Sequence, residues 1–315
     1  MIKLFQQHEK NDEFFEMQRE HLRYSDLSTV LSKSPAHWAY PDPEKKVTEH
    51  QEVAIASHMA ILDEASFNDK YVRMPAPEDY PHALMNDTQM KAFLKDRGVK
   101  GYLTKKTPEL IEMVRMTGEA VTIFPEVEAE FLKTVGKREP LKAKHFDKIV
   151  TMRRAIHADG EYSTMLNGGA NRLTFIGNLD VDGEKFQVSV TIDSISANAD
   201  LIDYVSTTNA KDDEFARNCL NYFRLMKAAL EYDVVTQYYA SIGQDVSFSS
   251  VFLCQEKTYP YVAQAYELTQ DQLDFGRGQY VSALRYIADC KKQNAYPAYG
   301  GGIKTLEFPA WSGVE

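Results

Sequence analysis

The chain has 315 residues, a hydrophobic fraction of 43% and a formal net charge of −10 from 36 basic and 46 acidic residues. The hydrophobic fraction excludes global disorder. The net negative charge excludes a surface that is basic all over, which is the kind of surface that non-specific nucleic-acid binders usually have. No apolar run approaches the roughly 18 residues of a membrane span, and the polar start lacks the apolar centre of a signal peptide. The three cysteines, Cys219, Cys254 and Cys290, are far apart in the sequence, which excludes a disulfide scaffold or a thiolate zinc site and predicts a cytoplasmic protein.

The first part of the chain predicts helices that are separated by proline-containing loops. Ser25 begins a helix that ends before Pro35, and residues 49–62 place apolar side chains at helical spacing. Residues 85–118 predict a small unit of two short helices, capped near Asn86 and Thr107. Such helix–extended–helix units often contact nucleic acid, but a purely structural insert fits this pattern equally well.

The charge of the chain changes between residues 133 and 154. Basic residues dominate this segment, and Glu139 and Asp147 are its only acidic residues. A stripe that contacts phosphates and a solvated helix face explain such a segment equally well. The candidate DNA-binding residues are Lys137, Arg138, Lys142, Lys144, Lys148, Arg153 and Arg154.

From Asn171 onward the sequence predicts an α/β core. Three β-rich runs cover residues 172–180, 185–193 and 200–206, and Asp182-Gly183 predicts a hairpin turn between the first two. A long amphipathic helix or a helix pair follows over 212–240, then strands over 246–255 and 261–268 and a helix over 270–292. This order predicts a mixed sheet that is covered by helices.

Two aspartates mark the place where we expect chemistry. Asp193 ends one predicted strand and Asp203 lies near the start of the next, so adjacent strands would bring both carboxylates to one rim of the sheet. Hard oxygen ligands of this kind suit Mg²⁺ or Mn²⁺. Aspartate is also common in turns, so a structural role remains open for each residue.

A series of short motifs resembles the RecE-type exonucleases (exonuclease VIII) of phage recombination, which belong to the PD-(D/E)XK nuclease superfamily. The motifs are Tyr24-Ser-Asp-Leu-Ser, Ser34-Pro-Ala-His-Trp, residues 56–62 with His58, Asp193, Asp203-Tyr-Val-Ser-Thr-Thr, residues 252–257 and the aromatic ending 296–311. The resemblance implies an α/β fold with a restriction-endonuclease-like core, in which a mixed central sheet is flanked by helices. It divides the chain into an N-terminal helical part of that core (1–84), a small helix–extended–helix insert (85–118) and the α/β core (119–315).

The same resemblance implies a metal site of His58, Asp193 and Asp203 for Mg²⁺ or Mn²⁺, but the site is degenerate. The family has a lysine two residues after its second acid, where it positions water and stabilises charge on the phosphate. Val205 stands at that position, and Val235 stands where the family has a glutamine. The surviving residues are therefore expected to be vestigial, and a packed structural histidine is an equally good interpretation of His58.

A displaced lysine would restore the site, and Lys185 and Lys211 are the candidates. Lys185 follows the predicted hairpin turn and Lys211 begins the predicted helix, so neither is expected to reach the aspartates.

These observations favour a catalytically impaired pseudonuclease that works in a host bacterial cytoplasm. Its expected partners are duplex DNA ends, a single-strand annealing protein or a host defence complex. The alternative is an active metal-dependent double-stranded DNA exonuclease of phage recombination. A third hypothesis is a structural subunit that shares only the fold. The family resemblance further implies a homo-oligomer, and we expect no membrane association.

Overall fold

The computed structural model describes residues 3–5, 21–44, 46–167, 169–300, 302–303 and 305. Contacts divide the chain into two units, Met1–Lys46 with Glu161–Glu315 as the first unit and Val47–Gly160 as the second. The expected domain limits at residues 84/85 and 118/119 both fall inside the second unit. Each unit is described by itself.

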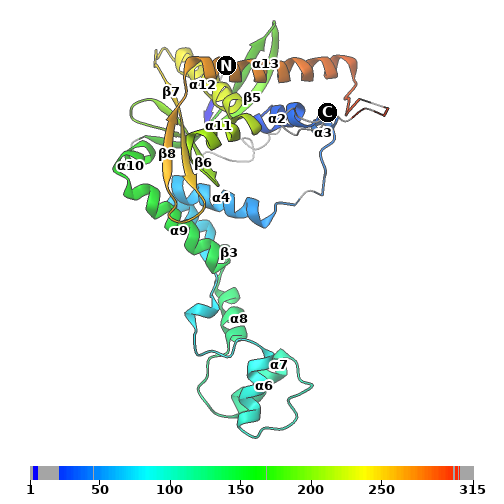
Figure 1. Cartoon of the computed structure of the whole chain (residues 1–315), viewed down its shortest axis with the longest axis vertical. Coiled ribbons are helices and arrows are strands. Elements are labelled where there is room, and N and C mark those ends of the chain that lie inside the picture. The colour runs from blue at the N-terminus through cyan, green and yellow to red at the C-terminus, as the bar shows by residue number, and fades with distance from the viewer. Residues whose placement is uncertain are drawn as a thin grey trace. The chain divides into compact units, whose positions relative to one another are not determined.

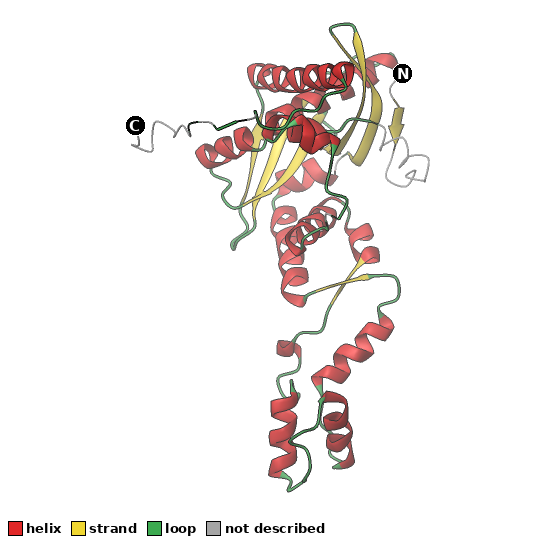
Figure 2. Cartoon of the chain, turned by 90° about the vertical axis from the view of Figure 1, so that its right-hand side faces the viewer, coloured by secondary structure: helices red, strands yellow, loops and turns green. Residues whose placement is uncertain are grey.

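The first unit contains a mixed sheet with helices packed against it (Figures 1 and 2). Within the described residues the sheet has six strands, and β6 and β7 form its parallel pair while the other neighbours are antiparallel. The mixed sheet predicted from the sequence is therefore confirmed. The strands, in spatial order, are β1 (Lys3–Phe5), β4 (Ala170–Val181), β5 (Glu184–Ile195), β6 (Asp200–Thr207), β7 (Ser249–Glu256) and β8 (Ala263–Glu267).

The turn between β4 and β5 confirms the predicted hairpin. Asp182 and Gly183 both have positive φ angles, 54° and 80°, and two such residues in succession give the turn that matches the twist of paired strands. The register then pairs Val181 with Glu184 at the end of the ladder.

Of the long helix or helix pair predicted over 212–240, the structure has the pair, α11 (Asp212–Asn221) and α12 (Arg224–Ser241). Phe223 lies between them with a left-handed backbone, φ 50° and ψ 36°. A non-glycine residue rarely adopts this conformation, and it ends the helical path. The pair is followed, after β7 and β8, by α13 (Gln270–Gln293).

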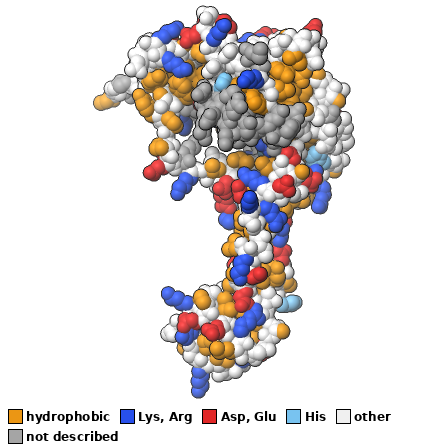
Figure 3. Space-filling view, turned by 180° about the vertical axis from the view of Figure 1, so that it is seen from behind, with side chains coloured by type: hydrophobic (Ala, Val, Ile, Leu, Met, Phe, Trp, Pro, Cys, Tyr) orange, Lys and Arg blue, Asp and Glu red, His pale blue; other side chains and the backbone are white. Residues whose placement is uncertain are grey.

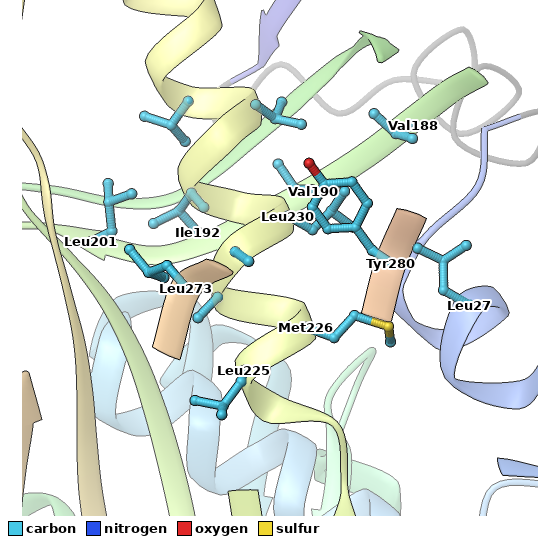
Figure 4. Packing of buried hydrophobic residues seen from close by; sticks show 14 of the residues in the cluster. Leu27, Val188, Val190, Ile192, Leu201, Leu225, Met226, Leu230, Leu273 and Tyr280 are labelled. Carbon is cyan, nitrogen blue, oxygen red and sulfur yellow. The ribbon is translucent and has the colours of Figure 1, made fainter. Parts of the chain in front are cut away.

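The main core of the first unit lies around α12. Figure 4 shows Met226 of α12 pointing toward Leu27 of α2 (Tyr24–Ser32), and Leu230 of α12 close to Tyr280 of α13 and Val190 of β5. All five are buried. The unit also contains α3 (Pro35–Ala39) and α10 (Gly160–Asn167), whose first residue belongs to the second unit. Because α12 packs directly on the sheet, its side chains can reach polar residues of the strands.

The second unit is mainly helical and has two apolar clusters. One joins α4, α5 and α9 through residues such as Phe67 and Ile149, and the other joins α6 and α7 through Met90, Leu94 and Leu110. The helix predicted over 49–62 and the pair of short helices within 85–118 are confirmed. The elements are α4 (Glu49–Leu62), α5 (Glu64–Lys70), β2 (Tyr71–Arg73), the 3₁₀ turn η2 (Pro77–Asp79), α6 (Asp87–Asp96), α7 (Thr107–Met116), α8 (Phe124–Thr134), β3 (Glu139–Leu141) and α9 (Ala143–Ala158).

Among the described helices of both units, none is long and apolar enough to span a bilayer.

Candidate functional site

The strands β5 and β6 place the two aspartates of the motif side by side. Their ladder pairs Ile195 with Leu201 and Ser194 with Ile202, and one further step sets Asp193 across from Asp203. At this point the backbone pairing stops, and the N–H of Tyr204 donates a hydrogen bond to Asp193 Oδ2 at 3.0 Å. Asp193 and Asp203 are each only 6% exposed. The structure thus brings these two sequence-predicted residues together.

An ammonium group from α12 contacts this pair. Lys227 Nζ lies 2.6 Å from Asp203 Oδ1 and 3.5 Å from Oε1 of Glu231, which follows one helical turn later. The Lys227 side chain is 22% exposed, whereas the Asp203 and Glu231 side chains are 7% and 9% exposed. Lys227 is therefore the part of this acid–lysine cluster (Asp193, Asp203, Lys227 and Glu231) that is most accessible to solvent.

Burial controls the protonation of the acid–lysine cluster. Removal from water raises the pKa of Asp203, and it raises the pKa of Glu231 to about 8. Burial alone would lower the pKa of Lys227, but the carboxylates of Asp203, Glu231 and Asp193 raise it above its ordinary value. At neutral pH, Lys227 is therefore an ammonium, and Glu231 largely holds a proton.

The lysines considered from the sequence do not supply this cation. Lys211 Nζ forms an ion pair with Asp213 at 3.2 Å, and Lys185 lies in β5 next to the hairpin turn. Val205, at the motif position of the lysine, is 3% exposed within the apolar core, and Val235 is fully buried there. The motif position is thus apolar, and the cation comes from a different element.

A pattern in the sequence could have identified Lys227. Arg224, Lys227 and Glu231 follow at spacings of three and four residues, which puts them along one face of a helix. Met226 and Leu230 beside them are fully buried. Because lysine and glutamate are almost never buried without a partner, this pair on a core-facing helix indicates a polar site opposite it.

Tyr24 of α2 adds a further polar group near the acid–lysine cluster. Its hydroxyl donates a hydrogen bond to the backbone carbonyl of Tyr222. Burial raises the pKa of Tyr24, while the charges of Arg224 and Lys227 act in the opposite direction. The first turn of α2 therefore lies within electrostatic reach of Lys227.

The carboxylates suit a divalent metal ion, although they do not form a complete cage. Within the described residues, no three His, Cys, Asp or Glu side chains are arranged to hold a metal ion. Mg²⁺ is usually held by one or two protein carboxylates, while water and substrate phosphates complete its shell. Asp203 Oδ2 is buried and has no hydrogen-bond donor, so the structure offers one oxygen of the required kind. The donor set therefore fits Mg²⁺ or Mn²⁺.

His58, the third predicted ligand, lies on α4 in the second unit, whereas both aspartates belong to the first. Its side chain is partly buried. Its role as a metal ligand stays a prediction.

The basic segment over 133–154 is partly neutralised within the second unit. Lys142 pairs with Glu49 at 2.7 Å and Arg153 with Glu64 at 2.6 Å. On the face shown in Figure 3, basic and acidic side chains are interspersed. Four of the predicted DNA-binding residues are exposed and make no ion pair with any described residue, namely Lys137, Arg138, Lys144 and Arg154.

Comparison with solved structures supports the fold. A crystal structure from Eubacterium rectale, described as a "Putative exonuclease", is 11% identical with a TM-score of 0.52, over 95% of both chains. At this identity the likeness shows the fold alone. The structure of a protein named SSO0001 is 10% identical over 44% of this chain and 63% of that one, with a TM-score of 0.25.

No curated protein matches the chain. A family model described as a PDDEXK-like domain of unknown function (DUF3799) matches residues 44–308, which is most of the chain and includes the whole acid–lysine cluster. The protein therefore belongs to this PDDEXK-like family.

Proposed function

We propose that this protein is a metal-dependent nuclease that hydrolyses phosphodiester bonds of DNA. The observation that carries the proposal is the contact between Lys227 Nζ and Asp203 Oδ1 at 2.6 Å. Nucleases of this fold combine carboxylates with a cation that stabilises charge on the phosphate. Val205 cannot provide that charge, and Lys227 brings it to the same aspartate from α12.

Each residue of the acid–lysine cluster then has a distinct task. Asp203, through Oδ2, and Asp193 would hold Mg²⁺ or Mn²⁺, which when bound supplies a Lewis acid and lowers the pKa of a water molecule. Lys227 keeps its proton on Nζ and donates hydrogen bonds to the phosphate oxygens that gain negative charge. Glu231, one turn further along α12, helps to hold the ammonium in place.

Within this class we propose an exonuclease that acts on duplex DNA ends in phage recombination. The support comes from the order of the RecE-type motifs along the chain and from the shared fold of the E. rectale protein. The exposed Lys137, Arg138, Lys144 and Arg154 would contact the DNA backbone. A homo-oligomer in the host bacterial cytoplasm is part of this proposal.

A second candidate is a pseudonuclease that binds DNA ends, an annealing protein or a host defence complex. The observation that favours it is that Lys227 already neutralises Asp203, while Asp193 and Asp203 are only 6% exposed. Under this alternative the cluster is a structural remnant that no longer receives a metal ion.

The two candidates are separated by digestion of end-labelled linear duplex DNA with Mg²⁺, with Mn²⁺ and with EDTA, with a covalently closed circle as the control substrate. The proposal predicts metal-dependent loss of the linear DNA only, and its abolition by Asp203→Asn. Inert protein with either metal, or digestion that Asp203→Asn leaves unchanged, would contradict the proposal and favour the pseudonuclease.

A further inference from the structure

A polar cavity of about 450 Å³ lies in the first unit, next to the first turn of α2. Its walls come from the segment before and within α2, from α3, from the β4–β5 hairpin and from the end of α13. This volume is within the range of small-ligand pockets, about 300–1,000 Å³. The basic, aromatic and amide side chains that line the cavity include Arg23, Trp38, Asn178, Lys185, Gln187 and Lys291.

The cavity has a surplus of positive charge. Its two acidic residues are already paired, since Asp26 Oδ2 lies 3.5 Å from Arg23 Nε and accepts a hydrogen bond from the backbone N–H of Arg23 at 2.8 Å, and Glu184 pairs with Lys292 at 3.0 Å. Lys185 and Lys291 are exposed and form no ion pair with any residue that the structure describes. An anionic ligand would therefore meet two uncompensated ammonium groups.

An aromatic ring lies among these cations. Lys291 Nζ is 5.9 Å from the centroid of the Trp38 ring, and the ring of Tyr296 supports Trp38 at a centroid distance of 6.1 Å. Trp38 is half-buried, so part of its surface remains accessible. An aromatic face beside a cation is the usual platform on which a nucleobase stacks.

The walls are tied together by backbone hydrogen bonds. The N–H of Leu22 donates to the carbonyl of Gln187 at 2.8 Å, and the N–H of Ser189 donates to the carbonyl of Leu22 at 2.9 Å. These bonds fix the segment that carries Arg23 against β5. The exposed amides of Asn178 and Gln187 lie in the same wall, where they can bond to the polar edge of a base.

The first turn of α2 joins this cavity to the acid–lysine cluster. Arg23 lines the cavity, and the next residue, Tyr24, reaches Tyr222 beside α12. We infer that the cavity binds one nucleotide of a single-stranded nucleic acid, with Trp38 stacking on the base and Arg23, Lys185 and Lys291 contacting phosphates. A single strand is required because neighbouring base pairs cover the base faces of a duplex. The inference rests on the proposed function, because the strand held in the cavity is the nucleic acid on which the acid–lysine cluster would act.

The test is binding of a fluorescein-labelled twelve-residue oligothymidylate, followed by anisotropy in EDTA at several salt concentrations. Trp38→Ala should weaken binding by roughly 5- to 150-fold, as loss of one base stack does, and Trp38→Phe should retain most of it. Lys185→Gln with Lys291→Gln should reduce the slope of log K against log salt by about 1.4, because each phosphate of a single strand that a lysine neutralises adds about 0.7 to that slope. Lys33→Gln, another exposed lysine of the first unit outside the cavity, is the matched control and should behave as the unmodified protein.

Unchanged affinity and salt slope in the double-lysine variant would overturn the inference, and so would an affinity for the oligothymidylate that Trp38→Ala leaves unchanged. If Trp38→Ala fails to fold, the double-lysine variant and Trp38→Phe still decide. Because binding is measured without metal, this outcome is independent of DNA digestion. A protein that binds through the cavity but never cleaves would refute the proposed function alone.

Discussion

Lys227 Nζ and Asp203 Oδ1 are 2.6 Å apart, and this ion pair joins the helix α12 to the strand β6 in the least exposed part of the polar site. It gives the chain a cation beside the motif aspartate although Val205 occupies the usual position of the lysine.

Removal of Lys227 should destabilise the fold by leaving buried carboxylates without a partner. We expect Lys227→Met to lower the free energy of unfolding at pH 8 by about 3–5 kcal/mol, the usual cost of breaking a buried pair. Urea unfolding measures this, and Asp203→Asn added to Lys227→Met should recover a large part of the loss. Strict additivity of the two substitutions would show that the residues do not interact.

The protonation of Glu231 predicts how stability varies with pH. Its pKa in the folded protein is raised to about 8 from an ordinary 4.5, so the folded state holds a proton that the unfolded state has lost between these values. Its contribution to stability is thus complete below about pH 4.5 and is lost as the pH rises to about 8.

The check is urea unfolding of Glu231→Gln and the unmodified protein at pH 5 and at pH 8. The variant should gain stability relative to the unmodified protein by about 3–4 kcal/mol over that interval, since each pKa unit corresponds to about 1.4 kcal/mol. A difference that stays constant, or that moves the other way, would contradict the assigned burial of Glu231.

Close packing between α12 and α13 predicts opposite effects for two glycines of one helix. A Cβ on Gly276 would lie 2.0 Å from the backbone oxygen of Leu225, whereas a Cβ on Gly278 would meet nothing within 4 Å. Gly276→Ala should therefore cost about 1–3 kcal/mol through overpacking. Gly278→Ala should stabilise the protein by about 0.5–1 kcal/mol through its better helix propensity. Thermal unfolding of the two variants, side by side, gives the comparison, and equal shifts would contradict the packing.

The exposed cations of the second unit predict salt-dependent binding of duplex DNA. Replacing Lys137, Arg138, Lys144 and Arg154 by glutamine should reduce the slope of log K against log salt by up to about 3.6, or about 0.9 for each phosphate contact on B-form DNA. Lys142→Gln is the matched control, because Lys142 already pairs with Glu49. An unchanged slope in the four-fold variant would identify the basic segment as a solvated face.

Much of the first unit could be predicted because local signals determine it. Alternating apolar residues and the Asp182-Gly183 turn indicate β4 and β5, and capping residues such as Thr269 mark helix starts. The break at Phe223 has no comparable signal, because phenylalanine rarely adopts a left-handed backbone. The limits of the second unit also escape prediction, because they depend on contacts between α4 and α9, which are far apart in the sequence.

Only the two aspartates of the candidate site could be predicted, because the position of the lysine depends on contacts between residues that are far apart in the sequence. Asp193 and Asp203 are visible as motif residues, but their pairing depends on the register of β5 and β6. Lys227 lies 24 residues after Asp203 and reaches it only because α12 folds back over the sheet. A search for lysine at motif spacing finds Val205 and therefore misses the cation.

The most direct test of the account is the rate at which Lys227→Met digests end-labelled linear duplex DNA with Mg²⁺, compared with the unmodified protein and with Lys33→Met. Assays at pH 7 and a stability measurement on each variant ensure that folded protein is compared. The account predicts that Lys227→Met is slower by about 10²–10³-fold, as for loss of one charge-stabilising donor, and that Lys33→Met is unaffected. Digestion by Lys227→Met at the unmodified rate would show that this ammonium has no part in the chemistry.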